Sequence, residues 1–337
     1  MMQLEIRRIQ KTGTWTMTVS LPKDWVEANK MKAGDPVEVR VIPDGTIVID
    51  PRVKQEKVET RKTIWVDEDE TKEHLTRKLI GAYLGGFSVV EVRGKERLSL
   101  DLKRAVKEIS RMVIGPEVIE ETSNTLVLHD LSDPIELPQE KCVRRMHLIV
   151  GSMHKDAIAA LEQMDEELAS DVIDRDADVD RLYWMAVKQH NLIMSNRKLS
   201  ESIGVDIYGS TALMLAARSA ERIGDHAEKI AGNVIIACQN RTKLGKVTDI
   251  GELSARSLST LDRAMEAFFR MDIRAANALI DDAEVLAKDC QNRMNDLRAP
   301  GSAAAIALAS VIDSISRTTM YAMDIAEVAI NAAMRAQ

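Results

Sequence analysis

The chain has 337 residues, of which 45% are apolar and only 3% aromatic, and this composition with its 17 methionines favours closely packed helices in two or three domains. The three cysteines, Cys142, Cys238 and Cys290, are too widely spaced for a disulfide framework or a Cys-x-x-Cys metal knuckle. The formal net charge of −7 is uneven, because residues 1–62 carry +3 and the remainder −10, and this difference suggests different partners for the two parts.

The N-terminus lacks the features of a signal peptide, and the longest apolar stretch, residues 303–312, is too short to span a bilayer. We therefore expect a cytoplasmic protein without membrane insertion.

Residues 1–52 are predicted to form a small β domain. Four short strands are expected, Leu4–Ile9, Trp15–Leu21, Pro36–Ile42 and Thr46–Ile49, with a turn at residues 43–45 and a brief helix after Pro22. A unit of about 50 residues rarely buries an adequate core by itself, so we expect it to dimerise or to lean on a neighbour.

The motifs of this domain resemble the AbrB/MazE/SpoVT family. They are Arg7-Arg-Ile-Gln-Lys-Thr-Gly13, Thr18-Val-Ser-Leu-Pro-Lys23 and Lys32-x-Gly34-Asp-x-Val-Glu-Val. The resemblance implies a swapped-hairpin β-barrel made by two chains, hence a homodimer, with basic loops that bind DNA. The residues at the family's basic positions are Arg7, Arg8 and Lys11, with Lys23 a weaker candidate. The alternative is a domain that serves dimerisation alone.

Residues 58–136 are predicted to form a small α/β domain. The strands Thr63–Val66 and Phe87–Val92 alternate with helices Glu68–Leu84 and Ser99–Met112, and two strands follow, in the order β-α-β-α-β-β. The acidic run at residues 67–70 is interpreted as the cap of the first helix. Residues 52–62 are a linker or the start of the first of these strands.

Residues 138–337 are predicted to be helical throughout. Breaks near residues 165–170, 198–206, 241–249, 271–272 and 299–301 divide this region into six helices, arranged as two three-helix repeats, 138–241 and 247–337.

Four acids in the first repeat form a candidate metal site. Glu221 and Asp225 are four residues apart on one side of a helix, beside its apolar face. On the preceding helix, Asp176 and Asp180 share the side of the apolar residues, whereas Asp174 and Asp178 face water. Hard cations are held by such convergent carboxylates from facing helices, with iron, manganese, zinc and magnesium all acceptable. The alternative is a solvated acidic face that is ion-paired by Arg218 and Arg222.

The same stretches resemble the PhoU family of phosphate-uptake regulators. The resemblance rests on Arg218-x-x-Glu-Arg-Ile-Gly-Asp-His-Ala-Glu-x-Ile-Ala231 and, earlier, Val172-Ile-x-x-Asp-x-x-Val-Asp-x-Leu-Tyr183. It implies an all-helical fold of two three-helix bundles, metal clusters on Glu/Asp-x-x-x-Asp motifs, and regulation of a phosphate transporter or phosphate-signalling protein. The second repeat retains only a weaker set, Glu284 and Asp324, because Met320 and Lys288 replace acids.

Three functions remain in consideration. The first is a non-enzymatic regulator of phosphate uptake that binds metal and possibly DNA. The second is a DNA-binding transcription factor whose helical body senses metal or phosphate. The third, a carboxylate-metal hydrolase or oxidase, is disfavoured because no histidine lies three residues after an acid, as di-iron enzymes require.

Overall fold

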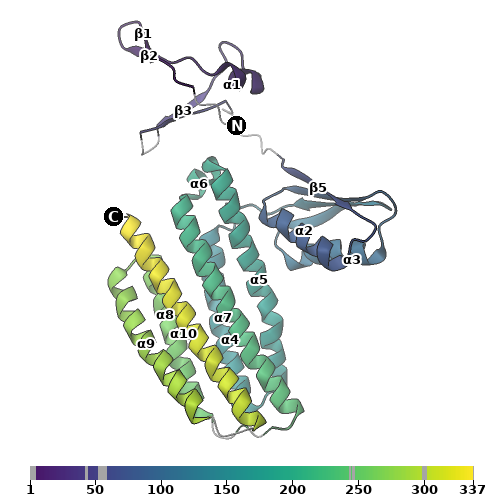
Figure 1. The fold of residues 1–337 in the computed structure, drawn as a ribbon, viewed down its shortest axis with the longest axis vertical. Coiled ribbons are helices and arrows are strands. Elements are labelled where there is room, and N and C mark those ends of the chain that lie inside the picture. Colours follow the sequence, from purple (N-terminus) through teal and green to yellow (C-terminus); the bar gives the residue numbers. More distant parts are fainter. Residues whose placement is uncertain are drawn as a thin grey trace. The chain divides into compact units, whose positions relative to one another are not determined.

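The structure is a computed structural model that describes residues 5–41, 45–51, 59–242, 244, 247–297 and 302–336. The chain divides into two compact units, Met1–Glu59 and Thr60–Gln337 (Figure 1). Residues 43 and 44 of the predicted turn at 43–45, most of the predicted linker and the break at residues 299–301 lie outside the described residues.

The N-terminal unit consists of two antiparallel hairpins and one short helix. Strands β1 (Gln10–Thr12) and β2 (Thr16–Thr18) pair around a turn at Gly13, and β3 (Glu38–Val41) pairs with β4 (Ile47–Asp50). Helix α1 (Lys23–Ala28) lies between the hairpins in sequence. The predicted strand Leu4–Ile9 is wrong: its described part, residues 5–9, is not a strand. A strand needs a pairing partner, and within one described chain the first hairpin supplies one only from Gln10 onward.

The described residues of this unit form no core of their own. No described side chain in residues 5–51 is buried. Ile6 is 93% exposed and Trp15 91% exposed. The other large exposed apolar side chains of the unit are Ile9, Met17, Val19, Val39, Val41, Ile47 and Val48. Apolar surface on this scale lowers the stability of an isolated chain unless another surface covers it.

The region after residue 59 begins with a two-layer α/β sandwich. Its elements are β5 (Arg61–Val66), α2 (Lys72–Leu84), β6 (Val89–Gly94), α3 (Leu100–Met112), β7 (Pro116–Glu121) and β8 (Thr125–Asp130), in the predicted order. The sheet order is β5-β6-β8-β7, with β5 and β6 parallel and the other pairs antiparallel. Leu79 and Ile109 from the helices and Leu126 from the sheet belong to its core.

The start of α2 differs from the prediction. The helix begins at Lys72, and its cap is Thr71, whose hydroxyl accepts a hydrogen bond from the His74 amide at 3.2 Å. The acidic run lies before the helix, in a turn closed by the Glu70 amide donating to the Asp67 carbonyl. The hydroxyl of Thr71, and not a carboxylate of residues 67–70, is therefore the cap that satisfies an unpaired amide of the first turn.

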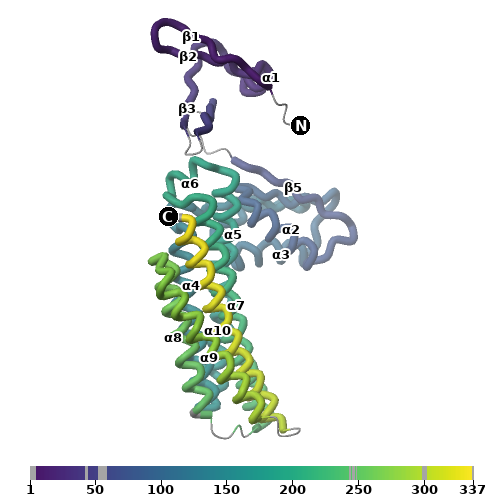
Figure 2. The backbone as a smooth tube through the Cα atoms, turned by 60° about the vertical axis from the view of Figure 1, so that its left-hand side comes forward, coloured from purple at the N-terminus to yellow at the C-terminus, as the bar shows by residue number. Residues whose placement is uncertain are grey.

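The remainder of the chain is a helical bundle (Figures 1 and 2). Its helices are α4 (Gln139–Gln163), α5 (Glu166–Ser195), α6 (Arg197–Ile203), α7 (Ile207–Gln239), α8 (Thr248–Arg270), α9 (Ile273–Asp296) and α10 (Ala303–Ala336). Helices α4, α5 and α7 pack on one another, as do α8, α9 and α10, and α7 packs on α10. One apolar core extends through both groups. Within the described residues, none of the helices combines the length and hydropathy needed to cross a membrane.

The described bundle contains seven helices, not the predicted six. The short α6 fills part of the predicted break at residues 198–206. Its N-cap is Asn196, whose side chain accepts from the Leu199 amide, and it ends at Gly204 with a φ of +75°. A loop was predicted because the seven residues of α6 are too few to show clear periodicity.

A buried ion pair joins the α/β sandwich to α5. Lys188 of α5, whose side chain is 2% exposed, pairs with Asp130 at the end of β8. Its ammonium also donates to the Ser132 hydroxyl at 2.8 Å and lies 4.7 Å from the centre of the Tyr83 ring. Gly115, at a φ of +108°, leaves the room that the Asp130 carboxylate occupies, because a Cβ there would collide with it. The sandwich is therefore attached to the bundle by a specific polar contact.

Candidate functional site

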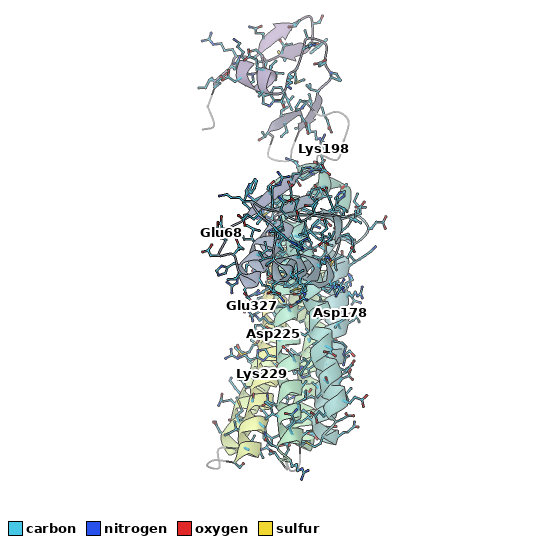
Figure 3. All side chains as sticks on the ribbon, turned by 90° about the vertical axis from the view of Figure 1, so that its right-hand side faces the viewer. Glu68, Asp178, Lys198, Asp225, Lys229 and Glu327 are labelled. Carbon is cyan, nitrogen blue, oxygen red and sulfur yellow. The ribbon has the colours of Figure 1, made fainter. Side chains whose placement is uncertain are left out.

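The candidate site lies where α5 and α7 pack on each other in the first helix group. Each helix has a strong N-terminal cap: the side chain of Asp165 accepts from two amides of α5, and Asp206 accepts from one amide of α7. Figure 3 labels Asp178 on α5 and Asp225 on α7 at a similar level along the bundle. The site thus occupies the middle of two long helices, where the backbone is fully hydrogen-bonded.

The predicted sidedness of α5 is confirmed. Asp174 and Asp178 are exposed, whereas Asp176 and Asp180 are partly buried. Alternate acids on one helix therefore have different environments, as a periodicity of 3.6 residues per turn requires.

The partly buried acids repel one another. Burial, followed by the charge of Asp180, raises the pKa of Asp176 to about 7. Glu228, Asp225 and Glu221 raise it further, in that order. The pKa of Asp180 is raised by burial and then by Asp225 and Glu228. The four predicted residues are therefore close enough to interact electrostatically across the two helices.

Glu228 is a fifth member of this cluster and was not predicted as a site residue. Its own pKa is raised by burial and by Asp225. The spacing of Glu221, Asp225 and Glu228 is four and then three residues, which keeps all three on one side of α7. That spacing was visible in the sequence, but only the Glu-x-x-x-Asp part of it was used.

Glu221 and Gly224 show how closely the two helices approach. The Glu221 side chain is 14% exposed, and its buried Oε2 atom has no hydrogen-bond partner among the described residues. A Cβ at Gly224 would lie 3.1 Å from Oδ1 of Asp176. The glycine therefore lets a carboxylate of α5 lie against the backbone of α7.

The arginines neutralise only part of the cluster. Arg222 donates to Oδ2 of Asp225 at 2.9 Å, and its Nε is 3.6 Å from Oε2 of Glu221. Arg218 instead donates to the hydroxyl of Tyr183 at 3.0 Å. Neither Asp176 nor Asp180 has a basic partner among the described residues, so the ion-paired alternative accounts for the α7 acids only.

The carboxylates are near one another but do not converge on one point. Among the described residues, no group of three or more His, Cys, Asp or Glu side chains is placed so that it could hold a metal ion. A shared ion would require rotation of these side chains about their χ angles.

The second helix group carries a weaker version of the site. Glu284 and Asp324 both have exposed side chains. Partial loss of hydration next to the helix surface, followed by the charge of Glu327, raises the pKa of Asp324. Met320, at the position equivalent to Glu221, is 44% exposed, and Lys288 is exposed. The two halves of the bundle therefore differ in the number and burial of the acids at these equivalent positions.

The charge of the cluster should make the stability of the metal-free protein depend on pH. Because the folded pKa of Asp176 lies above 3.8, the unfolded chain loses this proton first as pH rises. The free energy of unfolding should thus fall between about pH 4 and pH 7, by about 2 kcal/mol after solvent screening. Asp176→Asn should flatten this decline in urea titrations with chelator, and Asp178→Asn should not. An equal decline of the free energy of unfolding in wild type and Asp176→Asn would show that Asp176 is not the group responsible.

The four predicted DNA-contacting residues are all in the N-terminal unit. Arg7 pairs with Glu5 and donates to the Ser20 hydroxyl at 3.0 Å, and Lys23 lies 3.6 Å from Glu27. Arg8 and Lys11 are exposed and have no ion-pair partner among the residues that the structure describes. Of the four predicted residues, these two therefore have cationic groups that are not neutralised by a described acid.

Comparisons with known proteins support both sequence resemblances. Residues 143–234 match the family described as PhoU domain, and residues 10–57 match the family described as antidote-toxin recognition MazE, bacterial antitoxin. The search of curated proteins finds no match.

Two solved structures are similar to this chain. The crystal structure of PhoU from Pseudomonas aeruginosa gives a TM-score of 0.53 at 19% identity, over 59% of this chain and 96% of that chain. The crystal structure of the phosphate transport system regulatory protein PhoU from Streptococcus pneumoniae gives a TM-score of 0.47 at 21% identity, over 58% of this chain and 92% of that chain. The first of these similarities shows that the helical bundle has a PhoU-like fold.

Proposed function

We propose that this protein, which combines a PhoU-type helical bundle with a MazE-type N-terminal segment, is a non-enzymatic regulator of phosphate uptake that acts in the cytoplasm. The observation that carries the proposal is the PhoU-domain match in residues 143–234, which contains all five acids of the cluster. Its partner would be the phosphate transporter or a phosphate-signalling protein. A regulator needs a ligand-responsive element, and the acid cluster is the strongest candidate for one.

Phosphate uptake by intact cells tests this function directly. Cells that lack the chain should continue rapid uptake of radiolabelled phosphate when external phosphate is abundant, because the restraint on the transporter is lost. Restoring the wild-type chain should return uptake to the parental rate. Uptake that is the same with and without the chain, at both low and high external phosphate, would count against the proposal.

The chemistry of the cluster fits a hard cation. An all-carboxylate donor set suits iron, manganese, zinc or magnesium. Burial and then the neighbouring carboxylates raise the pKa of Asp176, and a bound cation would offset both effects. The residues that would hold it are Asp176, Asp180, Glu221 and Asp225, and Oε2 of Glu221, which accepts no hydrogen bond from a described residue, could serve as a donor to the ion. A bound ion would supply positive charge that joins α5 to α7. Glu284 and Asp324 would form a weak second site.

The N-terminal unit is proposed to dimerise as a swapped-hairpin barrel. Three observations support this: its two separate hairpins, its lack of any buried described side chain, and its exposed apolar residues. A second copy would supply both the missing apolar contacts and partners for the strand edges.

DNA binding by this unit is the second candidate function, in which the protein acts as a transcription factor with a sensing bundle. Arg8 and Lys11 favour it, because both are exposed and unpaired among the described residues. Changing Arg7, Arg8 and Lys11 together to alanine should weaken DNA binding and flatten the slope of log affinity against log salt. Gel shifts with genomic fragments at several salt concentrations measure this slope.

Two further variants complete the DNA experiment. Lys23→Ala should change the slope less, because Lys23 already has an acidic neighbour. A chain without residues 1–52 should lose the DNA complex and, in light scattering, the dimer. A triple variant with an unchanged slope would place the DNA contact elsewhere in the chain.

A further inference from the structure

The α/β sandwich has an open strand edge that the proposed function does not use. β7 is the last strand in the order β5-β6-β8-β7, so only one of its two sides is paired within the described sheet. A cleft of about 490 Å³ lies between this strand and α3, lined by Lys107, Ser110 and Arg111 of the helix and by residues 117–121 of the strand. An extended peptide can add a strand at an exposed sheet edge of this kind.

The hydrogen bonds of β7 show which of its backbone groups point away from β8. Two bonds mark the ends of the ladder: the Leu131 amide donates to the Gly115 carbonyl, and the Thr122 amide donates to the Thr125 carbonyl. Hydrogen-bonded and non-hydrogen-bonded pairs alternate along an antiparallel ladder. Counted from these two ends, in the register of β7 on β8, Val118 and Glu121 fall in non-hydrogen-bonded pairs. Their amides and carbonyls are therefore directed toward the open edge.

The face of the sheet that α3 covers is basic beside this edge. Val118 packs on the core of the sandwich, and Glu121 accepts from Lys107 of α3 at 2.8 Å. Arg111 is one helical turn beyond Lys107 and also lines the cleft, but it forms no ion pair with a described residue. Because only residues 113–115 join α3 to β7, the helix and the strand are antiparallel, and Arg111 lies nearer to Val118 than to the far end of the strand.

The opposite face of the sheet is acidic beside the same edge. Glu117 pairs with His129 and Glu120 with Val127, on the face away from α3 and from the core residue Leu128. Both carboxylates are exposed, and neither forms an ion pair with a described residue. A strand added to β7 would therefore meet a cation on the helix side and two carboxylates on the outer side.

We propose that the edge of β7 binds an extended segment of a partner protein in which one acidic side chain lies between two basic ones. The residue opposite Val118 would exchange backbone hydrogen bonds with it and direct a carboxylate toward the Arg111 guanidinium. Successive side chains of a strand point to opposite faces, so the residues before and after it would place basic groups near Glu117 and Glu120.

Other strands fit this edge less well. Exposed acids and a register shift discourage unselective pairing, because an arbitrary strand would lie beside two carboxylates that it does not neutralise. A second copy of β7 would place its own Glu117 and Glu120 next to these carboxylates, and like charges would repel. The charges on the two faces therefore select one pattern of alternating side chains and oppose the others.

Three synthetic peptides, capped at both ends and carrying a fluorophore, test the proposal by fluorescence anisotropy with the full chain. The matching peptide is Thr-Val-Lys-Glu-Lys-Val-Thr, and the reversed peptide, Thr-Val-Glu-Lys-Glu-Val-Thr, exchanges the charges. The third is the matching peptide with an N-methylated central Glu, which keeps every charge but cannot donate its amide to Val118.

We expect the matching peptide to bind with a dissociation constant on the order of 0.1 mM, as a short segment with few contacts. The reversed peptide should bind at least about tenfold more weakly, because its charges meet like charges on both faces. The N-methylated peptide should bind about tenfold more weakly, because one backbone hydrogen bond is lost. Binding of the matching peptide should also slow hydrogen–deuterium exchange in residues 116–121, measured by mass spectrometry.

Charge-reversed variants decide whether the peptide binds at this edge. Arg111→Glu should weaken binding of the matching peptide at least about tenfold. The triple change Arg111→Glu/Glu117→Lys/Glu120→Lys should reverse the preference, so that the reversed peptide binds more tightly than the matching one. Arg104→Glu is the matched control, since Arg104 is on the same helix but pairs with Asp101 and does not line the cleft. Circular dichroism verifies that every variant is folded.

Several results would overturn the proposal. These are no binding of the matching peptide at millimolar concentration, equal affinity for the reversed or the N-methylated peptide, or an unchanged preference in the triple variant. Unchanged hydrogen exchange in residues 116–121, or a loss in Arg104→Glu equal to that in Arg111→Glu, would also refute it. None of these results depends on whether the bundle regulates phosphate uptake.

Discussion

Lys188→Ala is expected to lower the free energy of unfolding by about 3–5 kcal/mol, because it leaves the Asp130 carboxylate buried without its cation. Asp130 is 10% exposed and would retain only the amide and hydroxyl of Ser132 as described partners. Burial lowers the pKa of Lys188 while the charge of Asp130 opposes this, so the ammonium depends on its partner. Urea denaturation followed by circular dichroism measures the loss.

Two variants separate the buried charge from lost packing. Lys188→Met with Asp130→Asn removes both charges at similar volume and should recover most of the stability. Lys229→Ala is the surface control, because Lys229 is 48% exposed and lies 3.6 Å from Asp313, and it should cost less than about 1 kcal/mol. A loss in Lys188→Ala as small as in Lys229→Ala would show that this ion pair does not hold the sandwich on the bundle.

Removal of metal is expected to destabilise the protein through the first helix group alone. If an ion binds the acid cluster and is present at about 100 times its dissociation constant, chelation should lower the free energy of unfolding by about 2.7 kcal/mol. Asp176→Asn together with Asp225→Asn should abolish this effect, because one ligand is lost from each helix. Asp324→Asn should preserve it, because Asp324 is exposed and its helix lacks an acid at Met320.

Elemental analysis measures the bound metal, and thermal unfolding of the same samples with and without a chelator measures its effect on stability. The purified wild-type chain and Asp324→Asn should contain metal in equal amounts, and the double variant should contain little. Metal loss that is equal in the Asp324 variant and the double variant would refute the difference between the two helix groups. Absence of bound metal after loading with each candidate ion would refute the metal site itself.

Much of the fold could be predicted from patterns that act over a few residues. Helical periodicity placed the long helices of the bundle and separated Asp176 and Asp180 from the exposed acids of α5. Ser99 was predicted to begin α3, and it is the N-cap of that helix, where its side chain accepts from the Leu102 amide. These features depend on local geometry, which each segment specifies by itself.

The errors arose where several local solutions were available. Four acids before α2 were assigned as its cap, but the hydroxyl of Thr71 occupies that position. The first strand was placed before Gln10, where the apolar pattern is present but the described chain supplies no pairing partner. In the first case, several neighbouring side chains could have capped the helix, and Thr71 does so. In the second case, a strand was compatible with the apolar pattern, but its formation depends on a partner strand elsewhere in the fold.

The sequence by itself determined the helical class of the bundle, the order of the α/β elements and the helix sides that carry the acids. Only the tertiary structure showed that Glu228 joins the cluster, that Lys188 meets Asp130 across 58 residues, and that the carboxylates do not converge on one point. The helical periodicity of a sequence predicts on which face of its own helix a side chain lies. The separation between helices, and thus which charges interact, depends on packing contacts between distant segments, such as the space that Gly224 leaves for Asp176.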